Sequence, residues 1–318
     1  MNFIRAELIH KAFLMQPIKA FSFVYYNTNI KMSKNNDCLV VELVGRRGQK
    51  GLLEIFHDVY DLLFLMLGAY PIRQNLTYND KAIDTSEWVG RYMTATHFNE
   101  TEAAFGDITI ENINSNSLIN IKKVHMQSLS SLSHIVSKYY EHVVTNHKIE
   151  LMLHTIDGFF IHSIYYDELL QKKRQKAKCN DTKYNENVER VFKQFFFYHR
   201  KYNCEILSVL GITKKIFYKT VTDTRNDFSH LLGKKKNRLI SGGDMVYYMD
   251  LIFIAERLFI LDEILNLRLN ETMIQEYMYI MHDWIDEVVN NRKNRIKSKR
   301  YINIQKLHKI ERNLCLVK

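Results

Sequence analysis

The stretch DMVYYMDLIFIAERLFILDEILNL, residues 244–267, is apolar on nearly every side when it is drawn as a helix. A helix that is hydrophobic all round is a buried helix. Asp244 follows Gly242 and Gly243 and suits an N-cap at the start of this helix. The stretch therefore predicts either the central helix of a bundle or a helix partly buried in a subunit interface, and the sequence leaves both open.

The rest of the C-terminal half carries the apolar periodicity of helices. The only two prolines, Pro17 and Pro71, lie well upstream of it. From about residue 126 onward, apolar residues recur three and four positions apart, which is typical of amphipathic helices. The predicted helices are Gln127 to Thr145, Ile149 to Lys176, Glu186 to Tyr202, Lys214 to Asp223, Asn226 to Leu232, Asp244 to Leu267 and Glu271 to Asn290. Residues 126–291 are therefore predicted to form an all-α bundle.

The first 125 residues mix two patterns. Apolar alternation predicts strands at Phe21–Tyr25, Cys38–Val44 and Ile108–Ile110. Between them, apolar residues from Leu52 to Met66 recur at helical spacing, and Gly68 is placed to end that helix. Residues 1–125 are predicted to form a small mixed domain. The predicted fold class of the whole chain is α+β, with this domain followed by the helical bundle.

Length, composition and cysteine spacing narrow the class of protein. The chain has 318 residues, 46% of them hydrophobic, which is enough to bury a full core and to form two domains. No apolar stretch reaches the roughly 20 residues that span a bilayer, so no membrane association is expected. Isolated cysteines without a C-x-x-C pair or a secretory leader favour a reduced, cytoplasmic setting. The four cysteines are Cys38, Cys179, Cys204 and Cys315.

The sequence lacks the motifs of several common classes of enzyme. It contains neither a phosphate-binding glycine loop nor a G-x-S-x-G elbow, which argues against a nucleotide-hydrolysing or esterase activity. His154 and His162 lie eight residues apart on one helical side, but no third ligand with suitable spacing accompanies them. No metal and no cofactor is therefore predicted.

The net charge of +10 is concentrated in the C-terminal half. Residues 292–312 contain nine lysines and arginines against Glu311 alone, so residues 292–318 are predicted to form a basic tail. A further cluster, Lys234, Lys235, Lys236 and Arg238, follows the motif described next. Basic clusters attract polyanions without reading their sequence, and RNA is the partner predicted here, with solvated surface as the alternative. These four residues are the predicted RNA-binding side chains.

The hexapeptide from Arg225 to His230 joins a permanent cation to an acid/base side chain. Arginine holds a phosphate by two parallel hydrogen bonds, and histidine gives or takes a proton near neutral pH. Side chains five positions apart lean toward one groove if a helix starts between them. Arg5 and His10 share this spacing, but Arg225 alone is followed by a polar amide, Asn226, and lies between two long helical patterns.

The run TRNDFSHLL, residues 224–232, resembles the motif of HEPN domains, most closely their ApeA-like branch. A Lys-rich loop, Gly242-Gly243-Asp244 and the long apolar helix ending at Leu265 complete the resemblance, which covers about residues 150–290. The resemblance implies that Arg225 and His230 are catalytic and that Asn226 is a polar helper. Leu232 stands where HEPN toxins controlled by nucleotidyltransferase antitoxins have Tyr, so control through such a Tyr is not implied.

The resemblance implies a metal-independent endoribonuclease in antiviral (phage) defence or in a toxin system. Such domains pair so that two motifs line one cleft, which implies a homodimer with a composite site. Cleavage by the 2′-hydroxyl of RNA would leave a 2′,3′-cyclic phosphate. The alternative is a catalytically inactive RNA-binding or protein-interaction module, in which Arg225 and His230 tie helices together. The N-terminal domain is expected to act as a sensor or regulator, and a regulatory partner is left open.

Overall fold

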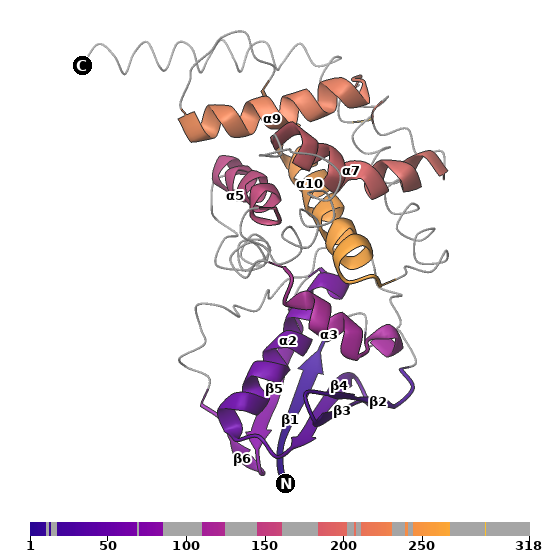
Figure 1. The fold of residues 1–318 in the computed structure, drawn as a ribbon, viewed down its shortest axis with the longest axis vertical. Coiled ribbons are helices and arrows are strands. Elements are labelled where there is room, and N and C mark those ends of the chain that lie inside the picture. The colour runs from indigo at the N-terminus through magenta and orange to yellow at the C-terminus, as the bar shows by residue number, and fades with distance from the viewer. Residues whose placement is uncertain are drawn as a thin grey trace, which may run out of the picture.

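The computed structural model describes residues 1–84, 110–124, 145–160, 184–201, 211–230 and 239–267, together with Leu207 and Asn290. Within these ranges, residues 11, 12, 14–17, 69 and 241–243 are not described. An antiparallel sheet comes first in the chain and helices follow it (Figure 1). The predicted α+β class is confirmed at this level.

The N-terminal part is a six-stranded antiparallel sheet with the strand order β2-β3-β4-β1-β5-β6. The strands are β1 (Asn2–Ile9), β2 (Phe21–Tyr25), β3 (Thr28–Asn35), β4 (Cys38–Gly45), β5 (Ile72–Tyr78) and β6 (Lys81–Ala82). Alternate residues of the central strands are buried, as Ile4, Ala6 and Leu8 are in β1. This alternation turns one face of the sheet toward the core.

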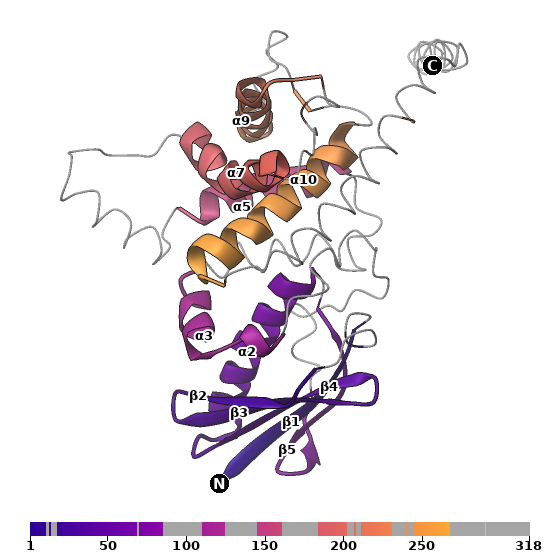
Figure 2. The same cartoon turned by 90° about the vertical axis from the view of Figure 1, so that its right-hand side faces the viewer.

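Helix α2 (Gln49–Leu67) and the shorter α3 (Ser115–Ile121) cover one face of the sheet (Figure 2). Helix α2 ends as the sequence predicts, because Gly68 takes the left-handed conformation, with φ of 80°, and donates its N–H to the Phe64 carbonyl. The opposite face carries a charged row in which Arg5 and Lys31 both pair with Glu42. Among the described elements, none covers this opposite face.

The C-terminal part is built around α10 (Asp244–Phe259), which continues into a π-helical turn, η4 (Ile260–Ile264). Every residue from Leu251 to Leu261 is buried, which confirms the prediction that this stretch is buried. Helices α5 (Thr145–Gly158) and α7 (Tyr184–Lys201) pack against α10, and α9 (Lys214–His230) packs on α5 and α7. Helix α9 lies at the end of the molecule away from the sheet (Figure 1).

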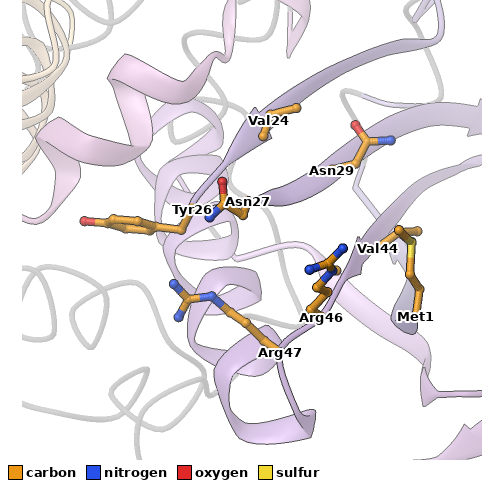
Figure 3. A pocket seen from close by; sticks show the side chains of 9 residues that line it. Met1, Val24, Tyr26, Asn27, Asn29, Val44, Arg46 and Arg47 are labelled. Carbon is orange, nitrogen blue, oxygen red and sulfur yellow. The ribbon is translucent and has the colours of Figure 1, made fainter.

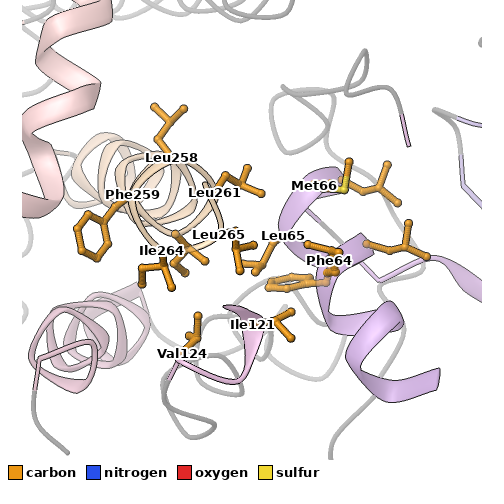
Figure 4. Close-up of a cluster of buried hydrophobic side chains, with 14 of the residues drawn as sticks. Phe64, Leu65, Met66, Ile121, Val124, Leu258, Phe259, Leu261, Ile264 and Leu265 are labelled. Atoms are coloured by element: carbon orange, nitrogen blue, oxygen red, sulfur yellow. The ribbon is translucent and has the colours of Figure 1, made fainter. Parts of the chain in front are cut away.

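The buried side chains of the two parts form one cluster. Phe64, Leu65 and Met66 of α2 approach Leu261 and Leu265 beyond the end of α10 (Figure 4). Arg257 of α10, which is fully buried, adds polar contacts across this junction. Its Nε donates to the Leu65 carbonyl and its Nη2 to the Met66 carbonyl, each over 3.0 Å. The sheet part and the helical part are therefore joined by both apolar packing and hydrogen bonds.

Two sequence-based predictions of secondary structure are wrong. Ile110 begins a short 3-10 turn (Ile110–Asn112), whereas alternation predicted a strand that ends there. The helices predicted at Lys214–Asp223 and Asn226–Leu232 are one continuous helix as far as His230. The predicted helices at 127–145 and 271–290 lie outside the described residues apart from their last residues, and the basic tail at 292–318 lies wholly outside them. Of the helix predicted at Ile149–Lys176, the described part ends at Gly158, and residues 161–176 lie outside the described residues.

Candidate functional site

Helix α9 carries all three predicted catalytic residues. Arg225 and Asn226 lie in its C-terminal half, and His230 is its last residue. The sequence predicted a helix that begins at Asn226, between Arg225 and His230. No helix begins there, because Asn226 lies inside the continuous helix α9. Positions five apart on one α-helix are about 7.5 Å apart along the axis and about 140° apart around it. Residues 225 and 230 therefore occupy different faces of α9.

Arg225 is anchored to a neighbouring helix by an ion pair. Its Nη2 donates to Oδ2 of Asp157, in α5, over 2.6 Å. The side chain of Arg225 is 23% exposed and that of Asp157 is 13% exposed, so water only partly screens the pair. Nη1 of Arg225 also donates to Oδ1 of Asn226 over 3.3 Å. Asn226 thus contacts the guanidinium, and its role as a polar helper stays a prediction.

Tyr184 of α7 also contacts the Arg225 guanidinium. The guanidinium carbon of Arg225 lies 5.1 Å from the centre of the Tyr184 ring, a cation–π distance. The Tyr184 hydroxyl donates to the Leu153 carbonyl over 2.9 Å. Burial is the main cause that raises the pKa of Tyr184 well above its usual value, followed by the Asp157 and Glu256 carboxyls, while Arg225 lowers it. The phenol is therefore neutral at physiological pH, and its ring packs against the Arg225 guanidinium.

A second carboxyl group, that of Glu256 in α10, is fully buried in the same region. It accepts a hydrogen bond from the Thr155 hydroxyl of α5, and its Oε2 has no hydrogen-bond partner among the described residues. Burial raises the pKa of Glu256 well above its usual value, against the lowering effect of Thr155. Burial therefore favours the neutral acid form of Glu256, whereas Asp157 is paired with the Arg225 cation.

The chain returns to α9 just before α10. The Ile240 N–H donates to the Thr224 hydroxyl over 3.0 Å, one residue before Arg225, and Thr224 in turn donates to the Thr220 carbonyl over 2.7 Å. The predicted RNA-binding residues Lys234, Lys235, Lys236 and Arg238 belong to the connection between His230 and Ile240 and lie outside the described residues. The connection begins at His230, the last residue of α9, and ends at Ile240, which is hydrogen-bonded to α9.

Other predictions concern metals and membranes. His154 is half-exposed, with Nε2 3.9 Å from Glu150, and His162 lies outside the described residues. The described residues hold no group of three or more histidines, cysteines, aspartates or glutamates arranged to hold a metal ion. Within the described part of the chain, no helix is long and apolar enough to cross a membrane.

Sequence reasoning missed three residues of this site, Asp157, Tyr184 and Glu256. Asp157 lies 68 residues before Arg225, and its helical neighbours Met152, Leu153 and Ile156 are buried. The available signal was a charged side chain inside an apolar helical run, which the sequence shows for both Asp157 and Glu256. Such a residue needs a partner inside the protein. Without the fold, that partner is not identified.

Comparison of the chain with protein-family models, with curated proteins and with solved structures gives no match. The α+β fold and the polar cluster of Asp157, Tyr184, Arg225, Asn226 and Glu256 are thus described from this chain alone. The likeness of the 224–232 motif to HEPN domains stays a prediction.

Proposed function

We propose that the chain is a metal-independent endoribonuclease in which Arg225 and His230 act on the phosphodiester of single-stranded RNA. The observation that carries the proposal is how Arg225 is held. Asp157 and Tyr184 fix the direction of its guanidinium, while 23% of the side chain stays exposed. A fixed and accessible guanidinium is suited to phosphate oxygens, because its fork of N–H groups matches their geometry. Charge that is already in place costs no reorganisation in the transition state.

The proposed reaction is an attack by the RNA on itself. The 2′-hydroxyl oxygen forms a bond with the adjacent phosphorus, the bond from phosphorus to the 5′-oxygen breaks, and the products are a 2′,3′-cyclic phosphate and a 5′-hydroxyl. One proton leaves the 2′-hydroxyl and one reaches the leaving oxygen. His230 transfers a proton, which is worth about 10²- to 10⁴-fold in rate, and Arg225 stabilises charge on the non-bridging oxygens.

The geometry of α9 supports the proposal of a dimer. The reaction uses a base and an acid, whereas the motif has one histidine per chain. Because residues 225 and 230 occupy different faces of one continuous helix, a second copy is the simplest source of the missing groups. We propose a two-fold homodimer in which two copies of Arg225 and His230 line one cleft, since closed two-fold pairs are the commonest homo-oligomers.

The ion pair also favours a second candidate function, a non-catalytic interaction module. Asp157 already neutralises Arg225, and a partly buried pair between α5 and α9 ties two helices together without any ligand. In this case His230 only ends the helix. The two candidates differ in what happens to RNA when His230 is removed and the fold is kept.

The test is cleavage of single-stranded RNA by wild-type protein and by His230→Ala in EDTA, with the 3′ ends of the products identified. His147→Ala is the matched control, because His147 is an exposed histidine at the start of α5, near Glu150. Circular dichroism and size-exclusion chromatography check that each variant folds and assembles alike. We expect cyclic-phosphate ends from wild type and His147→Ala and none from His230→Ala. Equal cleavage by all three would reject His230 as the catalytic group.

The composite site has a test of its own. Arg225→Ala and His230→Ala homodimers are each expected to be inactive. When the two variants are unfolded together and refolded, mixed dimers hold one intact Arg225 and one intact His230 in the shared cleft. Partial recovery of cleavage is therefore expected. Activity no higher than that of the separate variants would contradict a shared cleft.

We propose antiviral defence or a toxin-like role for this nuclease, on the strength of the motif resemblance. The contacts of Arg257 with α2 give the sheet part a physical route to restrain the helical part.

A further inference from the structure

A groove of about 680 Å³ opens on the sheet face that α2 does not cover. It lies where the turn between β2 and β3 meets the end of β4 (Figure 3). Val24, Asn29 and Val44 form its floor, from three adjacent strands in register. Tyr26, Arg46 and Arg47 stand at its rim. Its volume is within the range of about 300–1,000 Å³ that is usual for small-ligand sites.

The groove has an excess of positive charge. Arg46 and Arg47 are exposed, and neither guanidinium has a carboxylate partner among the described residues. By contrast, the cations further along the same face, Arg5 and Lys31, are both paired with Glu42, and Arg5 is also paired with Glu7. The first turn of α2, which follows Arg47, contains no acidic residue. An anionic ligand would supply the negatively charged partner that these two arginines lack among the described residues.

An aromatic residue, Tyr26, lies at the rim of the groove, in a turn whose backbone conformation does not favour tyrosine. Tyr26 and Asn27 form the two-residue turn between β2 and β3, with φ of 46° and 57°. Glycine and asparagine favour this left-handed conformation, and tyrosine does not. Tyr26 is nonetheless 50% exposed. Its ring centre lies 5.5 Å from the Arg47 guanidinium carbon, 5.3 Å from Nζ of Lys122 and 4.4 Å from the centre of the Tyr25 ring, so part of the ring is already in contact with the protein. Strained residues of this kind are concentrated at binding sites.

These side chains together fit one class of ligand. Cations that contact a phosphate backbone, combined with flat rings or guanidinium planes on which bases stack, are what proteins use to bind single strands. Asn27 and Asn29 add amide groups suited to the donor and acceptor edges of unpaired bases. Val24 and Val44, 62% and 36% exposed, offer apolar contact to the base faces. An acidic peptide would use the two arginines and leave the ring and the amides without a role.

We propose that this groove binds single-stranded RNA. The site lies in the sheet part, whereas α9 is at the other end of the molecule (Figure 2). The choice of RNA as the ligand rests on the proposed function, to which the groove adds a second contact with the substrate. Binding at the groove does not require cleavage, so the two proposals are tested separately.

The test measures binding of a short fluorescent single-stranded RNA to the full chain carrying His230→Ala, which removes cleavage. Arg46→Glu is compared with Lys81→Glu, which reverses an exposed charge on β6, at the opposite edge of the same sheet. Both changes alter the net charge equally. We expect Arg46→Glu to weaken binding about tenfold and to lower the slope of log affinity against log salt by about 1, because a phosphate contact is lost. Lys81→Glu should change the affinity by about twofold or less.

A second variant tests the role of the Tyr26 ring and is compatible with the turn between β2 and β3. Tyr26→Gly removes the ring and places at φ of 46° the residue that adopts this conformation most readily, so the fold should be kept. We expect weaker RNA binding and loss of photo-crosslinking from 4-thiouridine RNA to the peptide that contains residue 26.

Three results would overturn the proposal. The first is equal weakening by Arg46→Glu and Lys81→Glu, which would mean attraction by net charge alone. The second is crosslinking that never reaches this peptide. The third is that Arg46→Glu weakens binding of a poly-glutamate peptide and leaves RNA binding unchanged. This result would assign the groove to an acidic peptide. RNA bound here by a wild-type chain that never cuts it would reject the nuclease and leave this site in place.

Discussion

Arg225 of α9 donates to Asp157 of α5 over 2.6 Å, between two side chains that are 68 positions apart in the chain and largely shielded from water. This contact fixes the direction of the Arg225 guanidinium. In the proposed nuclease this contact would orient the guanidinium for a phosphate, and in the alternative interaction module it would only join the two helices. Its energetic contribution can be measured independently of either function.

A double-mutant cycle measures the strength of this contact. A hydrogen bond between charged, partly buried groups contributes about 1.5–3 kcal/mol, and we expect a coupling free energy of that size between Arg225→Ala and Asp157→Ala. Urea unfolding of wild type, both single variants and the double variant gives the value. A coupling near zero would show that Arg225 and Asp157 do not hold each other.

Glu256 is expected to make stability depend on pH. Its folded pKa is raised well above the unfolded value of about 4.3, so the folded state binds the proton more tightly. Stability from this group is complete below the unfolded pKa and is lost as the pH rises toward the folded pKa. The loss is about 1.4 kcal/mol per pH unit while only the unfolded state is ionised.

Glu256→Gln removes this ionisation and keeps the oxygen that accepts from Thr155. The difference in unfolding free energy between wild type and Glu256→Gln should therefore shift in favour of the variant as the pH rises from 5. Chemical unfolding at several pH values measures it. Parallel curves for the two proteins would show that Glu256 ionises equally in both states.

Arg257 is expected to couple the sheet part to the helical part. The last turn of α2 has no basic residue of its own, and the buried Arg257 supplies donors and positive charge to two of its carbonyls. Arg257→Met should lower stability by about 2–5 kcal/mol, because buried carbonyls lose their donors. Calorimetry should then resolve two transitions in place of one.

Arg257→Lys keeps the charge but not the fork of donors and should give a smaller loss. A single transition with unchanged stability in Arg257→Met would contradict a role in coupling. If the sheet part restrains the nuclease, the Met variant should also cleave RNA faster than wild type.

Gly45 is expected to be required at the end of β4. A Cβ there would lie 2.9 Å from Oγ1 of the buried Thr28, too close for a side chain with little freedom to move. Gly45→Ala should destabilise by about 1–3 kcal/mol, and the loss should shrink in a Thr28→Ala background. Gly48→Ser is the control, since no atom lies within 4 Å of a Cβ at residue 48 and serine suits this N-cap. Thermal unfolding ranks the variants, and equal stability of Gly45→Ala and wild type would refute the clash.

The sequence indicates the elements with strong periodicity and misses those that depend on distant partners. Helix α2 was predictable from its apolar stripe and Gly68, and α10 from its all-round apolarity. Strand β1 was not recognised, although Ile4, Ala6 and Leu8 alternate, because eight residues with one alanine give a weak signal. The break predicted before Asn226 is absent because packing of Val221 and the hydrogen bonds of Thr224 sustain the helix through a polar stretch.

The same limit applies to the sites. Arg225, Asn226 and His230 share a local sequence motif and one helix, although residues 225 and 230 occupy different faces of that helix. Asp157 and Glu256 reach the same region only through the packing of α5, α9 and α10, which no local pattern records. The groove beside Tyr26 depends on three strands in register and was not predicted at all.

Whether α9 cleaves RNA through the 2′-hydroxyl is decided by single-turnover cleavage in EDTA of an RNA that carries one 2′-deoxynucleotide. Wild-type protein should cut the all-ribose strand at every accessible linkage. In the substituted strand it should leave the linkage after the deoxynucleotide intact, because the 2′-hydroxyl is missing there, and cut the other linkages. His230→Ala should cut neither strand. Cutting that persists at the deoxy linkage, or equal cutting by His230→Ala, would contradict the proposed nuclease.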